Sequence, residues 1–190
     1  AGAPGPDECR DEEISFSHRR SVSAKTLLVN ELRKKPWNRV DAPVYSIVSQ
    51  HGQLANMNIC TYVTPVSMKP KLYLVGLYQG TLTLELVKKN PEFILQFLSR
   101  HQYPLVRLLG QQSGHKVPKI DRLRKRKLLS EWKGFPVLDE AIALLHLSVI
   151  QQWPGGDHSL FLCRVKSFQN RHAGPALELS LLKQKKLIRS

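Results

Sequence analysis

The chain has few cysteines, and they are not spaced as a metal site or a redox pair requires. Its three cysteines, Cys9, Cys60 and Cys163, form an odd set without CxxC spacing. Cys60 and Cys163 lie in apolar runs, where buried thiols are usual. Apart from His158, the histidines are scattered and lack a cysteine or carboxylate at ligand spacing. We therefore predict no metal site, no disulfide framework, and a reducing intracellular environment.

Long hydrophobic runs and hydrolase motifs are also missing. No apolar run approaches the roughly 18 to 20 residues that a membrane-spanning helix needs, so the sequence predicts a soluble or peripheral protein. There is no Gly-x-Ser-x-Gly, no Cys/His constellation and no spaced carboxylate pair, which disfavours a hydrolase. No internal repeat is present.

Acidic residues are in deficit: 15 against 29 lysines and arginines, giving a net charge of +14. Such an excess favours an anionic partner, either an acidic protein or a nucleic-acid-containing assembly. A merely solvated face remains the alternative, since no nucleic-acid-binding module motif and no array of stacking aromatics is present. The densest cationic cluster, expected at the surface within the polar stretch 111–127, consists of Arg122, Arg124, Lys125, Arg126 and Lys127.

Composition divides the chain into one domain with tails, because 42% hydrophobic residues can fill a core of ordinary size. We expect an acidic, polar tail over 1–20, a helix and linker over 21–40, the domain over 41–182 and a basic tail over 183–190. Ser23 is the predicted cap of the first helix and Pro36 its end. The start without methionine is compatible with a trimmed chain or with a removed targeting peptide of a plastid or mitochondrial protein.

From Val44 onward the pattern is period two and rich in β-formers. A hairpin is predicted from strands over 44–49 and 58–66 with its turn at 50–53, and a helix capped by Thr81 or Thr83 is predicted to end at Asn90-Pro91. A short helix is expected over 104–109. Further strands are predicted at 72–78, 92–98, 141–150, 159–168 and 176–182. Six or seven short strands with few helices favour an antiparallel barrel or sandwich.

Two motifs in this order resemble a known family. The first comprises Asn56, Thr61, Val66-Ser67 and Pro70, and the second is Gly156-Asp157-His158 at the start of a late strand. Together they resemble the flavin reductase-like group of FMN-binding split barrels. The resemblance implies a mostly β fold: a closed antiparallel split barrel with a few short peripheral helices. It also implies a homodimer, because the family usually builds its flavin site across two subunits.

The resemblance further implies FMN as cofactor, with FAD as the alternative, and NAD(P)H as reductant. A flavin needs a flat, mostly apolar slot with a few fixed donors, which tune its electron affinity. Hydride then passes directly from nicotinamide to flavin, so orientation replaces a covalent nucleophile. The implied flavin-contacting residues are Asn56, Thr61, Thr64 and Ser67, and the implied reductant-side residue is His158.

The phosphate end is implied at a helix start and a loop. Thr83 lies near the beginning of the predicted helix, whose free N–H groups suit an anion. Ser113, Lys116 and Lys119 match a loop that family members use near the cofactor, and Arg107 is a further candidate. The family's usual Arg or Lys in the preceding turn is replaced here by Gln79 and Gly80.

These departures leave a rival function open. The barrel could persist as a scaffold without flavin, with its basic surface docking it in a larger assembly. The missing turn cation and the charge excess favour this rival. A haem or another tetrapyrrole in the slot also stays open, as does the choice between NADH and NADPH.

Overall fold

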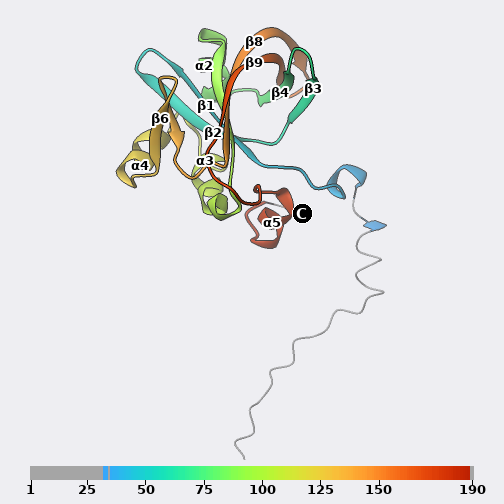
Figure 1. Ribbon diagram of the computed structural model, residues 1–190. Coiled ribbons are helices and arrows are strands. Elements are labelled where there is room, and N and C mark those ends of the chain that lie inside the picture. Colours follow the sequence, from blue (N-terminus) through green and yellow to red (C-terminus); the bar gives the residue numbers. More distant parts are fainter. Residues whose placement is uncertain (1–31, 34, 189–190) are drawn as a thin grey trace, which may run out of the picture. The chain divides into compact units, whose positions relative to one another are not determined.

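The computed structural model describes residues 32–33 and 35–188, which belong to two units, 1–39 and 40–190 (Figure 1). In the first unit, Leu32 and Arg33 are helical and η1 (Pro36–Asn38) is a single 3-10 turn. The predicted acidic tail, and the predicted helix apart from these few residues, lie outside the described part of the chain. Among the described residues, no helix is long and apolar enough to span a membrane.

The second unit is built on a seven-stranded antiparallel sheet with strand order β2-β1-β5-β8-β9-β4-β3 (Figure 1). A separate two-stranded hairpin pairs β6 with β7. The strands are β1 (Tyr45–His51), β2 (Leu54–Cys60), β3 (Val63–Ser67), β4 (Leu72–Tyr78), β5 (Glu92–Phe97), β6 (Leu129–Trp132), β7 (Phe135–Leu138), β8 (Ala143–Gly155) and β9 (His158–Asn170). The mostly β, antiparallel architecture is thus confirmed.

The first hairpin is confirmed, but its second strand differs from the expectation. β2 begins at Leu54, directly after a tight turn in which Gly52 adopts a φ of 59°. It ends at Cys60, and Thr61 and Tyr62 interrupt the β pattern before β3 begins at Val63. β3 then pairs with β4 rather than with β1. The predicted single strand over 58–66 is therefore two strands at opposite edges of the sheet.

The seven-stranded ladder does not close on itself, since β2 and β3 are its two edges among the described strands. The chain instead crosses from one edge to the other through Thr61 and Tyr62. The Gly76 N–H donates to the Tyr62 carbonyl at 2.8 Å, and the Cys60 thiol donates to the Gly76 carbonyl at 3.4 Å. These bonds hold the end of β2 close to β4, although the two strands are not paired in the sheet.

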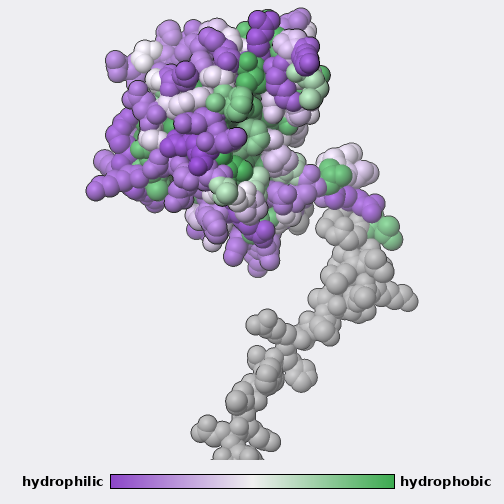
Figure 2. Space-filling model, viewed as in Figure 1, coloured by the Kyte–Doolittle hydropathy of each residue, from purple (hydrophilic) through white to green (hydrophobic). Residues whose placement is uncertain are grey.

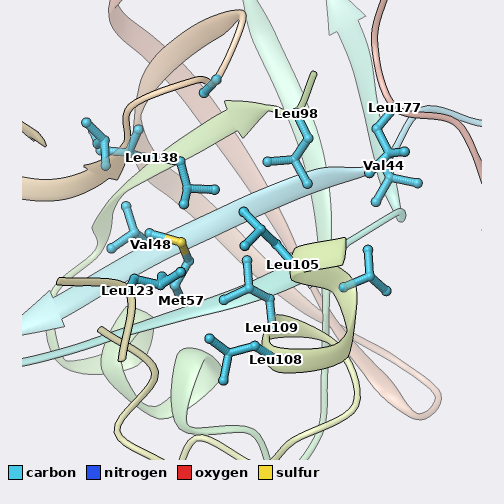
Figure 3. Packing of buried hydrophobic residues seen from close by; sticks show 14 of the residues in the cluster. Val44, Val48, Met57, Leu98, Leu105, Leu108, Leu109, Leu123, Leu138 and Leu177 are labelled. Atoms are coloured by element: carbon cyan, nitrogen blue, oxygen red, sulfur yellow. The ribbon is translucent and has the colours of Figure 1, made fainter. Parts of the chain in front are cut away.

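Period-two alternation gives the sheet two buried faces. On one face, Tyr45, Ile47 and Cys60 pack with Leu84 and Val87 of helix α2 (Leu82–Lys89). The opposite face packs against α3 (Val106–Leu109), α4 (Lys119–Lys125), the β6–β7 hairpin and α5 (Leu179–Gln184). Figure 3 shows part of this second core, with leucines of α3 gathered against residues of β1 and β2.

Helix α2 matches its sequence signals, and Thr81 rather than Thr83 caps it. The Thr81 hydroxyl accepts a hydrogen bond from the Leu84 N–H, and Asn90 follows the last helical residue. The helix expected over 104–109 is a 3-10 turn, η2 (Arg100–Leu105), continued by α3. The strands at 72–78, 92–98, 141–150 and 159–168 are confirmed, with β8 extending to Gly155.

The predicted strand over 176–182 is wrong. Only isolated bridges form there, Pro43 with Glu178 and Ser99 with Ala176, and α5 follows. Leu177 is buried in the extended segment before α5, and Leu181 and Leu182 are buried on α5 itself. The packed chain reaches Leu187, beyond the expected domain boundary at 182, since Leu187 is buried in the same core.

Candidate functional site

Two adjoining cavities lie where β2 and β4 end and α2 begins. The inner cavity, about 130 Å³, and the outer cavity, about 250 Å³, share Asn58, Tyr78 and Thr81 in their walls. The inner cavity is lined by Ile47, Asn58, Ile59, Cys60, Thr61, Tyr62, Gly76, Leu77, Tyr78, Thr81, Thr83 and His158. The outer cavity is lined by Asn56, Asn58, Tyr78, Gln79, Gly80, Thr81, Leu82, Gly110, Gln111, Gln112, Ser113, Gly114 and Lys119.

Asn56 and Thr83, both predicted site residues, meet between the strand and the helix. The Asn56 Nδ2 atom donates to Thr83 Oγ1 at 2.9 Å, and both residues are buried. The loop after α3 comes very close to this pair at Gly114. A Cβ atom there would lie 2.6 Å from Asn56 Oδ1, so only glycine allows this approach. The amide and hydroxyl are therefore held in fixed positions at the cavity wall.

Lys119 is the cation of the site, and it is 2% exposed. Its Nζ atom donates to the Leu109 carbonyl at 2.7 Å and to Asn58 Oδ1 at 3.1 Å. Both acceptors are neutral, and within the described part of the chain no carboxylate forms an ion pair with this ammonium. Burial lowers the pKa of Lys119 to about 8, because removing the charged form from water is unfavourable. The sequence expectation that the whole 111–127 stretch is surface is wrong at this residue.

His158 lies at the inner cavity within an aromatic group. Its ring centroid is 4.6 Å from that of Tyr62 and 5.3 Å from that of Tyr78. Asp157 Oδ1 lies 2.6 Å from His158 Nδ1 and fixes the orientation of the imidazole. Thr61 lines the same cavity. Two predicted residues from distant parts of the sequence, Thr61 and His158, are thus neighbours in space.

Other predicted residues lie apart from these cavities. Thr64 is exposed on β3, where its hydroxyl donates weakly to the Pro65 carbonyl at 3.4 Å, and Ser67 ends the same strand. Neither lines either cavity, and nor does Arg107 of α3. Ser113 does line the outer cavity, close to Lys119.

The predicted cationic cluster is exposed. It occupies the last part of α4 and the two residues after it, and Arg124 pairs with Asp121 at 2.8 Å. Hydrophilic residues dominate the side of the molecule that carries α4 (Figure 2).

Sequence reasoning missed Asn58, Tyr62 and Tyr78 as cavity residues. A signal for Asn58 was present: it alternates with Asn56 and Cys60, so all three share one face of β2, opposite the buried Met57. For Tyr62 and Tyr78 no local signal exists. Their meeting with His158 depends on how the chain crosses between the sheet edges and on the pairing of β4 with β9.

Residues 37–185 match the model of the flavin reductase like domain family. The chain belongs to the flavin reductase-like family. Among curated relatives, this flavin reductase-like chain is 28% identical over 124 residues to an uncharacterized protein of Pyrococcus abyssi, covering 65% of this chain and 71% of that protein. It is 25% identical over 140 residues to putative diflavin flavoprotein A 3 of Nostoc sp., covering 73% of this chain and 24% of that protein. The chain thus spans about a quarter of that diflavin relative.

Solved structures agree with the family assignment. The flavin reductase-like chain superposes on an FMN-binding protein from Thermus thermophilus with bound 1-cyclohex-2-enone, with a TM-score of 0.64 at 24% identity, over 72% of this chain and 74% of that one. The NADH:FAD oxidoreductase SgcE6 of Streptomyces globisporus gives a TM-score of 0.67 at 18% identity, over 83% and 90% of the two chains. At these identities the likeness establishes the fold.

Proposed function

We propose that this protein binds a flavin in the inner and outer cavities and transfers hydride to it from NAD(P)H. The observation that carries the proposal is Lys119, a buried cation with only neutral partners at the wall of a cavity. A charge buried in this way is unfavourable unless an anion compensates it. A phosphate group in the outer cavity would supply that compensation.

The residues present fit a flavin at both ends of the site. The inner cavity has an apolar base of Ile47, Cys60 and Leu77 with aromatic rings at its rim, which suits a flat ring system. The outer cavity combines Ser113 and Lys119 with the start of α2, whose N–H groups and dipole favour an anion. Lys119 supplies the cation that Gln79 and Gly80 of the turn lack.

The chain's own groups would act by positioning. A bound flavin would supply the two-electron acceptor for the hydride of NAD(P)H, with a proton taken from solvent. His158, held by Asp157, would orient the nicotinamide at the inner cavity. Tyr62 and Tyr78 would flank the rings and exclude water, while Thr61 would offer a hydroxyl to the flavin edge. Asn58 would hold the Lys119 ammonium towards the phosphate.

Flavin binding and NAD(P)H-dependent flavin reduction test the proposal separately. We expect the purified protein to quench FMN fluorescence at micromolar ligand, and the double change Thr61→Ala and His158→Ala to lower turnover by at least tenfold. The matched control is His51→Ala, in an exposed position at the end of β1. Undiminished turnover in the double variant would show that the assigned residues are wrong.

The scaffold alternative makes the opposite prediction. A folded protein that is colourless and ignores both FMN and FAD would favour it, and the absorption spectrum of a bound haem would favour the tetrapyrrole. One of the two sequence arguments for a scaffold was the missing turn cation. The location of Lys119 weakens that argument, because a cation reaches the outer cavity from the first turn of α4.

We further propose that two copies associate through the face carrying β3. Large apolar side chains are exposed there and at the ends of neighbouring strands: Tyr62, Val66, Met68, Tyr78 and Trp153. Tyr62 and Tyr78 also line the inner cavity, so a second copy on this face would help enclose the ligand. Light scattering should give twice the chain mass, and Val66→Glu should reduce it to one chain. A monomeric wild-type protein would refute the homodimer.

The exposed cationic cluster supports a separate proposal, docking to an acidic protein or a nucleic-acid-containing assembly. Replacing Arg124, Lys125 and Arg126 by Glu should abolish binding to single-stranded RNA or to a polyglutamate probe at low salt. If wild type and variant bind both probes equally, the docking proposal is refuted and the cluster is only a solvated face.

A further inference from the structure

A small apolar pocket lies apart from the two cavities of the proposed flavin site, where η2 meets the end of β7. Its volume is about 170 Å³, and it is lined by residues of η2 together with Leu128, Leu138 and Glu140. It shares no lining residue with the inner or the outer cavity. The proposed flavin function therefore leaves this η2 pocket without a role.

The walls of the η2 pocket are held in place by the fold. Leu105 and Leu138 line the pocket and also belong to the second core, where Figure 3 labels both. The Asp139 N–H donates to the Leu128 carbonyl at 3.0 Å, which ties the segment after α4 to the end of β7. A ligand would therefore enter a preformed pocket, and little ordering of the protein would oppose its binding.

The η2 pocket has the size and lining for one apolar side chain. Small-molecule and cofactor sites usually measure about 300–1,000 Å³, whereas a cavity of about 150 Å³ holds a benzene-sized group. At about 170 Å³ the η2 pocket suits a leucine or phenylalanine side chain and is too small for a nucleotide. Its lining is mostly apolar: Pro104, Leu105, Leu128 and Leu138.

Exposed cations adjoin the η2 pocket. Arg126 and Lys127, the last two residues of the cationic cluster, directly precede Leu128 of the pocket wall. Arg100 is the first residue of η2, and all three cations are exposed. Within the described part of the chain, none of the three forms an ion pair with a carboxylate. These positive charges are available to a ligand.

The carboxylates at the η2 pocket do not balance these cations. Glu140 lines the pocket, and the neighbouring Asp139 is already paired with Arg171, whose Nη2 atom lies 3.1 Å from Asp139 Oδ1. Lys185 adds a further positive charge, because its ammonium lies over the ring of Tyr103 in η2, 5.4 Å from the ring centroid. The surroundings of the pocket are therefore positive overall and favour an acidic ligand.

A nucleic acid matches this surface less well than a protein does. Sequence-tolerant binding of single strands combines cations with aromatic side chains on which bases stack. Among the described residues, every exposed large apolar side chain lies outside the range 100–140. The cations here adjoin a pocket for one apolar side chain instead, and a buried anchor of that kind with a polar rim is typical of protein interfaces.

We propose that the η2 pocket and the cations beside it form a docking site for an acidic segment of a partner protein, which inserts one leucine or phenylalanine side chain into the pocket. Arg126 and Lys127 bind carboxylates of that segment. This inference rests on the docking proposal for the cationic cluster and not on flavin binding. It selects an acidic protein over a nucleic acid and extends the docking surface from α4 to η2.

A pair of peptides tests the inference. Two fluorescein-labelled, glutamate-rich peptides that differ only in a central phenylalanine or alanine are titrated into the full-length protein at low salt, with fluorescence anisotropy as the readout. We expect the phenylalanine peptide to bind at least about tenfold more tightly, the effect of burying one aromatic side chain. Because this comparison uses the unaltered protein, it does not depend on the folding of any variant.

Variants locate the binding site. Leu128→Gln replaces part of the apolar wall with an amide, and Pro104→Glu places a carboxylate at an exposed position of the pocket. Each should reduce the preference for phenylalanine to less than about threefold. Arg126→Gln with Lys127→Gln should weaken both peptides by about threefold or more and keep the preference, because exposed ion pairs contribute modestly and independently of the anchor.

The matched control removes two positive charges elsewhere. Lys88→Gln with Lys89→Gln alters exposed residues at the end of α2, which packs on the other face of the sheet. It should leave both peptide affinities nearly unchanged. Thermal unfolding and FMN fluorescence quenching of every variant show whether the fold and the flavin cavities are intact.

The outcomes separate this inference from the proposals on which it builds. Equal affinity for the two peptides, or an unchanged preference in both Leu128→Gln and Pro104→Glu, refutes the pocket and leaves docking by charge alone. Equal weakening in the Lys88 and Lys89 control refutes a site at α4 and η2. A single-stranded RNA that binds more tightly than the phenylalanine peptide and displaces it would assign the surface to nucleic acid. A folded protein that binds neither peptide nor RNA overturns the docking proposal as well.

Discussion

Because Lys119 is buried, we predict that flavin affinity depends on pH through the ligand's phosphate and not through its ring. Burial lowers the pKa of this lysine from 10.5 to about 8, so it is mostly charged at pH 7 and mostly neutral at pH 9.5. A bound phosphate dianion favours the charged form and raises the pKa again. Below pH 8 binding therefore needs no proton, whereas above pH 8 binding must take one up, and affinity falls as pH rises.

The size of the effect follows from the two pKa values. If phosphate restores the ordinary value of 10.5, FMN affinity at pH 9.5 is roughly thirtyfold lower than at pH 7, or about 2 kcal/mol. Phosphate monoesters lose their second proton near pH 6, with a pKa of about 6, so the phosphate of the ligand keeps a nearly constant charge over this range. If phosphate restores less of the shift, the loss of affinity is smaller and has the same direction.

The assay is a set of binding isotherms for FMN and riboflavin between pH 7 and 9.5. Riboflavin shares the ring but has no phosphate, so its affinity should not show the Lys119 slope. Lys119→Gln should weaken FMN at pH 7 by about tenfold, the loss of a charge-assisted hydrogen bond, and should give a flat profile. Lys125→Gln, an exposed residue of α4, is the control. Identical pH profiles for FMN and riboflavin, or an unchanged slope in Lys119→Gln, would refute the assignment of Lys119 to the phosphate.

Three further outcomes concern stability and reactivity. Thr83→Val removes the acceptor of the buried Asn56 amide and should lower the free energy of unfolding by about 1–3 kcal/mol in urea titrations; an unchanged midpoint would mean that the pair is not a net stabiliser. Gly80→Ala should cost about 1 kcal/mol, because Gly80 has a φ of 70° although nothing lies within 4 Å of an added Cβ. Cys60 and Cys163 are buried and burial raises the pKa of each thiol to about 12; both should resist a thiol reagent at pH 8 until guanidinium unfolds the chain, and rapid labelling of either in the native state would contradict the packing.

The sequence predicted those strands and helices whose formation depends on residues close together in the chain. The nearly continuous apolar run over 72–78, the strand over 92–98 and the helix capped by Thr81 or Thr83 depend on residues close in sequence, and these elements are confirmed, with Thr81 as the cap. The sequence did not predict the β6–β7 hairpin. Lys133 and Gly134 both adopt positive φ, as in a two-residue hairpin turn, but Lys-Gly is not one of the dipeptides that mark such a turn.

The remaining errors come from tertiary contacts. Period alone does not distinguish a strand from a short helix over 176–182, and the contact of Leu177, Leu181 and Leu182 with the second core decides it. Lys119 lies in a strongly basic stretch, and its neighbours predict exposure. It is buried because Ile120 and Leu123 anchor α4 on the sheet and direct the ammonium to Leu109 and Asn58.

Thr61 and Tyr62, where the chain crosses between the sheet edges, form one wall of the inner cavity. Few backbone hydrogen bonds hold this crossing to the sheet. The Gly76 amide there depends on a single carbonyl, that of Tyr62. Deuterium should therefore replace its proton sooner than the amide protons of β5 between β1 and β8. A molecule seated against this wall would slow that replacement, so the isotope content of one backbone position would report occupancy without any optical signal from the ligand.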